Sequence, residues 1–243
     1  MNALLSAVNL SKHYDDGFRG LHRLNLTVES GEMLFLLGAN GAGKTTTINL
    51  FLDFLRPSDG GAFVDGIEVA AEPLRAKAKL AYLPETVALY ESLSAESNVR
   101  YFAGLAGNRH IARSAIVDAL IRTGLSVPDV SRRVAVFSKG MRQKLGIAIA
   151  LLTHAKNLIL DEPTSGLDPV SANGLMLLLR ELRDEGAAIL LSTHDVFRAK
   201  GSADRVAIMR RGEVLAQLSR EEVERTDLEA LYMSLMASEG VLQ

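Results

Sequence analysis

The feature that most constrains the fold is a glycine-rich octapeptide in the first fifth of the chain. It fits the pattern Gly-x-x-x-x-Gly-Lys-Ser/Thr with the residues Gly38, Ala39, Asn40, Gly41, Ala42, Gly43, Lys44 and Thr45. Glycines let backbone N–H groups curl around an anion, and a helix that follows points its positive end at the same place. An apolar run at 33–37 precedes the octapeptide and a helix-compatible run at 46–50 follows it. The pattern therefore predicts a strand, a phosphate-binding loop and a helix.

The residue types in this loop predict a nucleoside triphosphate with Mg²⁺ as the ligand. Lys44 would reach the β- and γ-phosphate oxygens, and the Thr45 hydroxyl would ligate the metal. Thr46, the next residue, is a further candidate for nucleotide binding. A glycine-rich turn with a surface lysine is the alternative interpretation, and the flanking strand and helix disfavour it.

Hydrophobic patterning predicts an α/β fold: a phosphate-loop NTPase core with an N-terminal antiparallel β subdomain and an inserted α-helical lobe. Strand-like runs at 3–10 and 21–28 and a tight-turn signal at Asp65-Gly66 make the first third β-rich. Between about 85 and 154 the period becomes helical, with one apolar stripe made of Ile111, Ala112, Ala115, Ile116, Ala119 and Leu120.

The last third alternates again between strands and helices. Strands are predicted at 157–160, 187–192 and 205–209, and a helix capped by Asp168 is predicted at 170–185. Ser219 and Thr226 each begin a capping-box pattern, which predicts a helical tail. We expect one domain over 1–243, with a core at 1–84 and 155–218, a helical lobe at about 85–154 and a tail at 219–243.

Composition excludes several classes of site and partner. The chain has no cysteine, so disulfides and thiolate metal sites are excluded. A net charge of −2 gives no electrostatic reason to expect nucleic acid as a partner. Residues 1–10 lack a signal-peptide pattern, and the strongest apolar run, at 145–152, is shorter than the roughly 20 residues that span a bilayer. We expect a chain outside the membrane that can still dock on a membrane protein.

Two carboxylates follow the apolar strand predicted at 157–160. These are Asp161 and Glu162, and the carboxyl ends of strands form the ligand crevice of open α/β sheets. Asp161 is suited to hold Mg²⁺, and Glu162 to orient or deprotonate an attacking water. Asp-Glu-Pro is also ordinary turn chemistry, an alternative that the phosphate loop makes less favourable.

Three further motifs narrow the class of NTPase. Residues 137–143 (Phe-Ser-Lys-Gly-Met-Arg-Gln, here the signature loop) precede Asp161, residues 165–168 (Ser-Gly-Leu-Asp) follow Glu162, and residues 192–195 (Ser-Thr-His-Asp) follow the next strand. In this order and spacing the chain resembles the ATP-binding subunits of ABC transporters, from about Leu4 to Gly212.

The resemblance implies roles for individual residues. Tyr14 would stack on adenine, and Ser138 and Gly140 of the signature loop would contact the γ-phosphate of ATP held by a second copy. Asp168 would lie in a loop that communicates across the dimer, and His194 would contact the γ-phosphate and support Glu162. Each of three residues also has a purely structural interpretation. Tyr14 could be a packing residue, Ser138 could cap a helix, and His194 could be an ordinary surface histidine.

Two departures from the family pattern bear on mechanism. Glu85 stands where the family usually has a glutamine that links the core to the lobe, and an ionised glutamate only accepts hydrogen bonds. It could therefore ligate Mg²⁺ but could not donate to a water. Lys139 and Met141 depart from the commonest signature loop. Both departures resemble the exporter branch that pairs with separate six-helix permeases.

The resemblance implies an ATPase in which two subunits enclose two ATP molecules head to tail. The pair would be a homodimer or a pseudo-dimer with a related ATPase, would use Mg²⁺, and would drive export through an integral membrane permease from the cytoplasmic side of the cell membrane. One rival is a soluble ABC-type ATPase acting on nucleic acid or ribosomes. Another is a regulatory protein without turnover, which the intact Glu162 and His194 disfavour.

Overall fold

The computed structural model describes residues 3–153 and 155–237. A four-stranded antiparallel sheet in the order β2-β1-β4-β5 is built from β1 (Ala3–His13), β2 (Arg19–Glu29), β4 (Asp59–Val64) and β5 (Ile67–Glu68). Leu24, Leu26 and Val28 alternate inward along β2, as expected for a strand with one buried face. Asp65 and Gly66 both have positive φ, 53° and 75°, which confirms the predicted tight turn.

A six-stranded sheet forms the core beside it. Its order is β10-β9-β3-β8-β7-β6. Within the described part of this sheet the β9–β10 pair is antiparallel and the other pairs are parallel. The strands are β3 (Met33–Leu37), β6 (Leu80–Leu83), β7 (Asn157–Asp161), β8 (Ala188–Thr193), β9 (Arg205–Arg210) and β10 (Glu213–Ser219). Every residue of β3 and β8 is buried, because parallel strands at the centre of such a sheet are covered on both faces.

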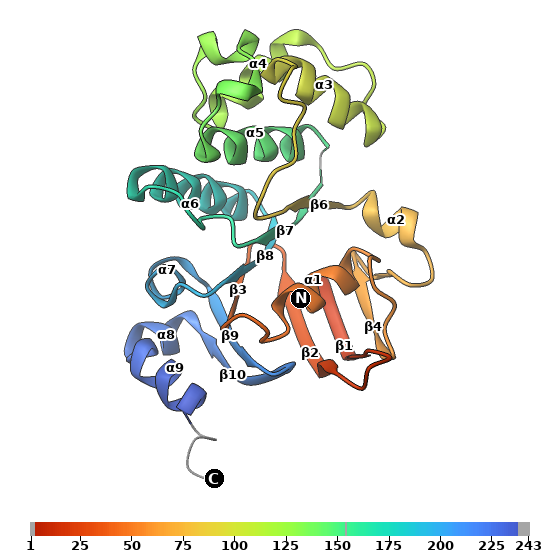
Figure 1. The fold of residues 1–243 in the computed structure, drawn as a ribbon, viewed down its shortest axis with the longest axis vertical. Coiled ribbons are helices and arrows are strands. Elements are labelled where there is room, and N and C mark those ends of the chain that lie inside the picture. Colours follow the sequence, from red (N-terminus) through yellow and green to blue (C-terminus); the bar gives the residue numbers. More distant parts are fainter. Residues whose placement is uncertain (1–2, 154, 238–243) are drawn as a thin grey trace.

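A helical lobe lies at one end of the molecule, away from the antiparallel sheet (Figure 1). It contains α3 (Ala95–Leu105), α4 (Arg113–Arg122), α5 (Lys139–Leu152) and two short 3-10 helices, Val127–Ser131 and Val134–Val136. Its apolar side chains form a core of their own. The predicted stripe extends beyond a helix, since α4 begins at Arg113, after Ile111 and Ala112.

The other helices flank the two sheets. They are α1 (Lys44–Phe51), α2 (Pro73–Lys77), α6 (Pro169–Asp184), α7 (Val196–Ser202), α8 (Arg220–Arg225) and α9 (Leu228–Ala237). Asp168 caps α6 by accepting from the N–H of Val170 and of Ser171, at 3.0 and 2.9 Å, which confirms that prediction. The Ser219 capping box is also confirmed.

The second predicted capping box, at Thr226, is wrong. Thr226 ends α8, and the Asp227 carboxylate accepts from the N–H of Ala230 at 3.1 Å at the start of α9. The aspartate lies directly before the first helical residue, where its short carboxylate reaches the free N–H groups of the first turn. Nowhere in the described ranges is a helix both long and apolar enough to cross a bilayer.

The topology brings the phosphate loop, the acidic pair and the Ser-Thr-His-Asp motif to one edge of the core sheet. Leu37, directly before the phosphate loop, pairs with Thr193, and Asp161 pairs with Ser192. These positions are the carboxyl ends of β3, β8 and β7, the edge where open α/β sheets bind ligands.

Candidate active site

The phosphate loop joins β3 to α1 and requires glycine at its last turn. Gly43 has φ 106°, and a Cβ atom there would lie 3.0 Å from both the Gly20 oxygen and the Gly212 Cα. No side chain of the described residues caps α1, so its first N–H groups are available to an anion. Gly41 also has positive φ, 79°, and a Cβ there would meet open space. The backbone is thus shaped as a cradle.

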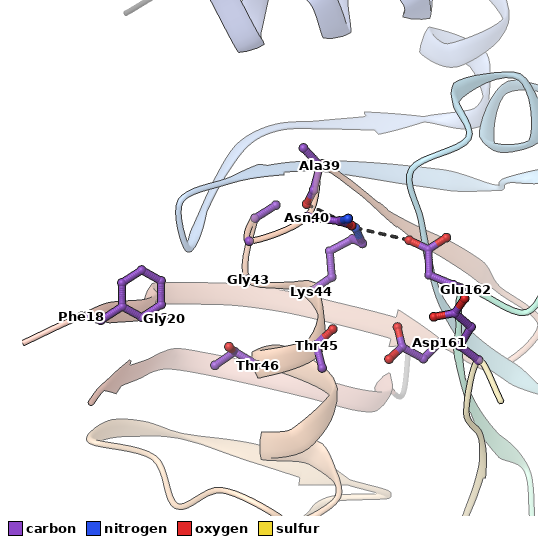
Figure 2. Close-up of a pocket in the computed structure, with 13 residues that line it drawn as sticks. Phe18, Gly20, Ala39, Asn40, Gly43, Lys44, Thr45, Thr46, Asp161 and Glu162 are labelled. Atoms are coloured by element: carbon purple, nitrogen blue, oxygen red, sulfur yellow. Dashed lines mark hydrogen bonds and ion pairs between the residues drawn. The ribbon is translucent and has the colours of Figure 1, made fainter. Parts of the chain in front are cut away.

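The cradle opens into a pocket of about 300 Å³. Figure 2 shows Phe18 at one end and the two carboxylates at the other, with Lys44 between them. The pocket is lined by Phe18, Gly20, Ala39, Asn40, Gly41, Ala42, Gly43, Lys44, Thr45, Thr46, Glu85, Asp161 and Glu162. Gly38 lies beneath the loop, where a Cβ would come within 2.6 Å of the Met209 oxygen.

Lys44 carries a buried positive charge into this pocket. The residue is 5% exposed, and its Nζ donates to the Gly38 carbonyl at 2.5 Å. The same atom lies 3.4 Å from Oε1 of Glu162, the contact drawn in Figure 2. The ammonium faces the space that an anion would occupy.

Asp161 ends β7 and is held by Ser192. The Ser192 Oγ donates to Oδ1 of Asp161 at 2.5 Å. Burial raises the pKa of Asp161; the Ser192 hydrogen bond lowers this pKa, and the neighbouring charge of Glu162 raises it. The charge of Lys44 also lowers this pKa, but the net shift is upward, so the burial of an ionised Asp161 is only partly compensated.

The donor set of the pocket fits Mg²⁺. Figure 2 shows the Thr45 hydroxyl and the Asp161 carboxylate facing each other. No group of three or more His, Cys, Asp or Glu in the described part of the chain could cage a metal alone. Mg²⁺ characteristically binds through one or two carboxylates together with substrate phosphates, so one carboxylate and one hydroxyl beside a phosphate cradle suffice.

Glu162 stands between Lys44 and His194 on a constrained backbone. Its φ is +45°, a conformation that costs energy for a residue with a side chain. Its N–H is held by the carbonyl and Oγ of Ser192, at 3.2 and 3.0 Å. Its Oε2 lies 2.9 Å from Nδ1 of His194. This carboxylate is thereby aimed at the edge of the phosphate pocket.

His194 lies on the far side of Glu162 from the phosphate loop. It borders a second hollow of about 240 Å³ that also includes Glu162, and its own side chain is 60% exposed. Through the shared Glu162, the structure brings together Lys44, Asp161, Glu162 and His194, all predicted from the sequence.

Ser192 was missed as a site residue because only sheet register reveals it. It is fully buried and contacts both carboxylate residues of the pair, Asp161 and Glu162. The sequence shows only that Ser192 is a polar residue at the end of an apolar strand. That Asp161 is its partner follows from the pairing of β7 with β8.

Tyr14 and Phe18 share the open end of the site. Tyr14 lies outside the pocket lining: its hydroxyl is 3.3 Å from Oγ1 of Thr46, and its ring packs over Gly20, with no room for a Cβ. Phe18 does line the pocket, is 55% exposed, and its ring centroid lies 5.9 Å from that of Tyr14. Sequence reasoning missed Phe18, although an aromatic directly after the turn at Gly17 was a usable signal.

The signature loop does not line the phosphate pocket of its own chain. Ser138 caps α5 by accepting from the N–H of Met141 at 3.2 Å, which confirms the cap interpretation. Gly140 faces α6, where an added Cβ would lie 3.3 Å from Oγ of Ser171. Glu85 lines the pocket, but its carboxylate accepts from the Ser165 hydroxyl at 2.9 Å.

Known proteins resemble the chain along nearly its whole length. Residues 21–165 match the ABC transporter family. The ABC transporter ATP-binding protein NatA of Bacillus subtilis is 36% identical over 95% of this chain and 97% of its own. The lantibiotic transport ATP-binding protein SrtF of Streptococcus pyogenes is 34% identical over 94% and 96%. A solved ATP-binding subunit of an ABC transporter superposes with a TM-score of 0.84 at 33% identity, over 96% and 99%.

These similarities confirm the fold class and the family that the sequence motifs predicted. Members of this family bind ATP with Mg²⁺ and hydrolyse it, and one solved relative, cbiO1 of Clostridium perfringens at 28% identity, is part of an ABC transporter complex. The chain belongs to the ABC transporter family as one of its ATP-binding, ATP-hydrolysing subunits.

Proposed function

We propose that the pocket holds ATP with its phosphates on the loop and its adenine toward Phe18 and Tyr14. Lys44 and the N–H groups of the loop would bind phosphate oxygens, and Thr45 and Asp161 would hold Mg²⁺. The metal would neutralise charge on the phosphates. The observation that carries the proposal is the Glu162 carboxylate held between Lys44 and His194, 3.4 and 2.9 Å away.

In this proposal Glu162 accepts a proton from the attacking water. Its fixed backbone and its contact with His194 hold the carboxylate where a water beyond the terminal phosphate would lie. Positioning and charge stabilisation supply most of the catalysis in phosphoryl transfer. One carboxylate oxygen of Glu85 already accepts from the Ser165 hydroxyl, so we assign this residue a secondary part in metal binding.

We further propose that two subunits complete each other's sites. Ser138 and Gly140 do not line the pocket of their own chain. In a head-to-tail pair, which we propose to be a homodimer, they would reach the γ-phosphate held by the partner, with Asp168 near the interface. The α5 N-terminus, capped by Ser138, would then point at an anion.

The permease partner is proposed to dock where the lobe meets the core. An apolar hollow of about 190 Å³ lies there, lined by Tyr82, Leu83, Pro84, Val87, Ala88, Leu89, Phe102, Gly146 and Ile149. Exposed Tyr90 and Tyr101 lie in the neighbouring segments, with ring centroids 4.8 Å apart. Aromatic side chains that stay partly exposed are typical of a binding surface. The chain would sit at the inner face of the cell membrane, held by the permease.

We propose export as the direction of transport, supported by the likeness to SrtF, whose name denotes lantibiotic transport. The division into a core at 1–84 and 155–218, a lobe at about 85–154 and a tail at 219–243 is part of the same proposal. In it, the lobe carries the signature loop to the partner subunit.

The proposal is tested by purifying the chain from gently solubilised cells and measuring phosphate release from MgATP. We expect a copurifying polytopic membrane protein and Mg²⁺-dependent turnover that rises more than linearly with subunit concentration. Absence of a membrane partner together with capture of RNA or ribosomes would support the rival soluble ATPase. For the chain separated from its membrane partner, at concentrations where it is monomeric, turnover strictly proportional to subunit concentration would contradict the shared sites.

A further inference from the structure

The two departures from the family pattern, Glu85 and Lys139, meet in space. Nζ of Lys139 lies 3.8 Å from Oε1 of Glu85, and the Ser165 hydroxyl donates to that same oxygen at 2.9 Å. Glu85 follows β6, Lys139 begins α5, and Ser165 follows β7. One carboxylate oxygen of Glu85 therefore joins the segment after β6 to the start of α5 and to the loop after β7.

The surroundings hold this arrangement in place. The buried Gln143 donates its amide to the Glu85 carbonyl at 3.0 Å, which anchors the backbone of Glu85 to α5. Gly166 has φ +66°, and an added Cβ there would lie 3.4 Å from Nζ of Lys139. The lysine side chain thus packs beside Gly166, within van der Waals reach of that position.

Glu85 also belongs to the phosphate pocket. It lines that pocket with Asp161 and Glu162, so three acidic residues border the space that would hold a polyanion. After burial and the effect of Glu162, the charge of Glu85 is a further cause that raises the pKa of Asp161. Its negative charge is therefore felt at the metal-binding end, and a compensating cation matters there.

We propose that Lys139 is a positioning residue for nucleotide binding in its own chain. By pairing with Glu85, its ammonium holds that carboxylate at the rim of the phosphate pocket and offsets its charge. The inference rests on the proposed function, in which this pocket binds ATP. A residue of the signature loop, which would serve the partner's ATP, thus also tunes the affinity of its own chain's pocket.

The Lys139–Glu85 ion pair is solvent-exposed, which limits how strongly it can change the affinity for MgATP. The side chains of Lys139 and Glu85 are 39% and 52% exposed, and exposed ion pairs couple weakly because water screens them. Removing the lysine charge should therefore weaken MgATP binding by roughly two- to fivefold at low salt. The difference should shrink toward one at about 1 M salt, where the Debye length falls to about 3 Å.

The test measures the affinity for a fluorescent ATP analogue with Mg²⁺, on the whole chain at concentrations where it is monomeric. We expect Lys139→Met to bind more weakly than the parent, and Lys139→Arg to bind like the parent. Glu85→Gln should abolish the effect of Lys139→Met. The matched control is Lys144→Met in the same helix, whose ammonium donates to the Gly124 carbonyl within the lobe; its affinity should equal that of the parent.

The outcomes separate the inference from the proposed function. Equal affinities of Lys139→Met and the parent, with the parent binding ATP, would overturn the inference alone. A loss that persists in the Glu85→Gln background would also overturn it, because Lys139 would then act without Glu85. No binding by the parent would overturn the proposed function, and the inference with it.

Discussion

Nδ1 of His194 lies 2.9 Å from one carboxylate oxygen of Glu162, while Nζ of Lys44 lies 3.4 Å from the other. Each oxygen of the Glu162 carboxylate thus contacts a different basic side chain. A triphosphate that reached Lys44 would replace Glu162 and the Gly38 carbonyl as partners of its ammonium. Glu162 would then keep its contact with His194 and turn its other oxygen toward water.

The first prediction concerns Glu162→Gln. The amide cannot accept a proton, so we expect ATP to bind while hydrolysis falls by at least about 10²-fold, the lower range for loss of a general base. Phosphate release and nucleotide binding, measured on the same sample, check this. Glu213→Gln, an exposed residue of β10, is the control and should keep parental turnover. Near-parental turnover of Glu162→Gln would remove this residue from the role of base.

Lys44→Ala should fail at an earlier step. Because the buried ammonium faces the phosphate cradle, its loss should weaken ATP binding by about tenfold or more, as for charged hydrogen bonds worth roughly 1.5–3 kcal/mol. Lys200→Ala, on the exposed side of α7, is the matched control. Equilibrium binding without turnover makes the measurement, and tight ATP binding by Lys44→Ala would contradict the assignment of the loop.

Local sequence signals predicted the elements of the site because those signals are themselves local. The phosphate loop needs glycines at fixed offsets, and Asp168 and Ser138 cap helices by reaching three residues ahead or fewer. Such interactions depend on spacing along the chain alone. For the same reason the error at Thr226 was small: the helix exists, and only its cap is displaced to Asp227.

Contacts between distant segments could not be predicted from one sequence. Ser192 reaches Asp161 only because β7 and β8 pair in parallel register. Lys139 reaches Glu85 only because α5 returns to the end of β6, across more than fifty residues of chain. The sequence marked Glu85 and Lys139 as separate departures, and the fold makes them one charge pair.

Ser192→Ala tests how the acidic pair is held. The change removes the donor to Asp161 and one of the two acceptors of the Glu162 N–H, which keeps the Ser192 carbonyl. It leaves an oxygen of the partly buried Asp161 without its hydroxyl donor, at a cost of about 1–3 kcal/mol. We expect a lower melting temperature and reduced turnover. Ser234→Ala in α9, whose hydroxyl is exposed, is the control. Parental stability and turnover of Ser192→Ala would show that strand pairing alone positions the acids.

Burial of Asp161 gives the ligand-free protein a defined pH dependence. Since its pKa is raised above the ordinary 3.8, the folded chain binds this proton more tightly than the unfolded chain does. The resulting contribution to stability is fully present below the unfolded pKa and is lost as pH rises through the folded pKa. Above that window, ionised Asp161 lowers stability until a cation neutralises it.

Asp161→Asn should therefore separate stability from function. The amide carries no charge and its oxygen can still accept from Ser192, so the ligand-free variant should melt about 1–3 °C higher than the parent at pH 7. The difference in melting temperature between the variant and the parent should close as the pH falls toward 4.

Mg²⁺-dependent ATP binding by Asp161→Asn should weaken by about tenfold, because a carboxylate ligand is lost. Thermal melts from pH 4 to 8 and Mg²⁺ titrations measure both effects, with Asp118→Asn, an exposed position in α4, as control. A variant that melts below the parent at pH 7 would mean that the attraction between Asp161 and Lys44 outweighs the burial of the charge.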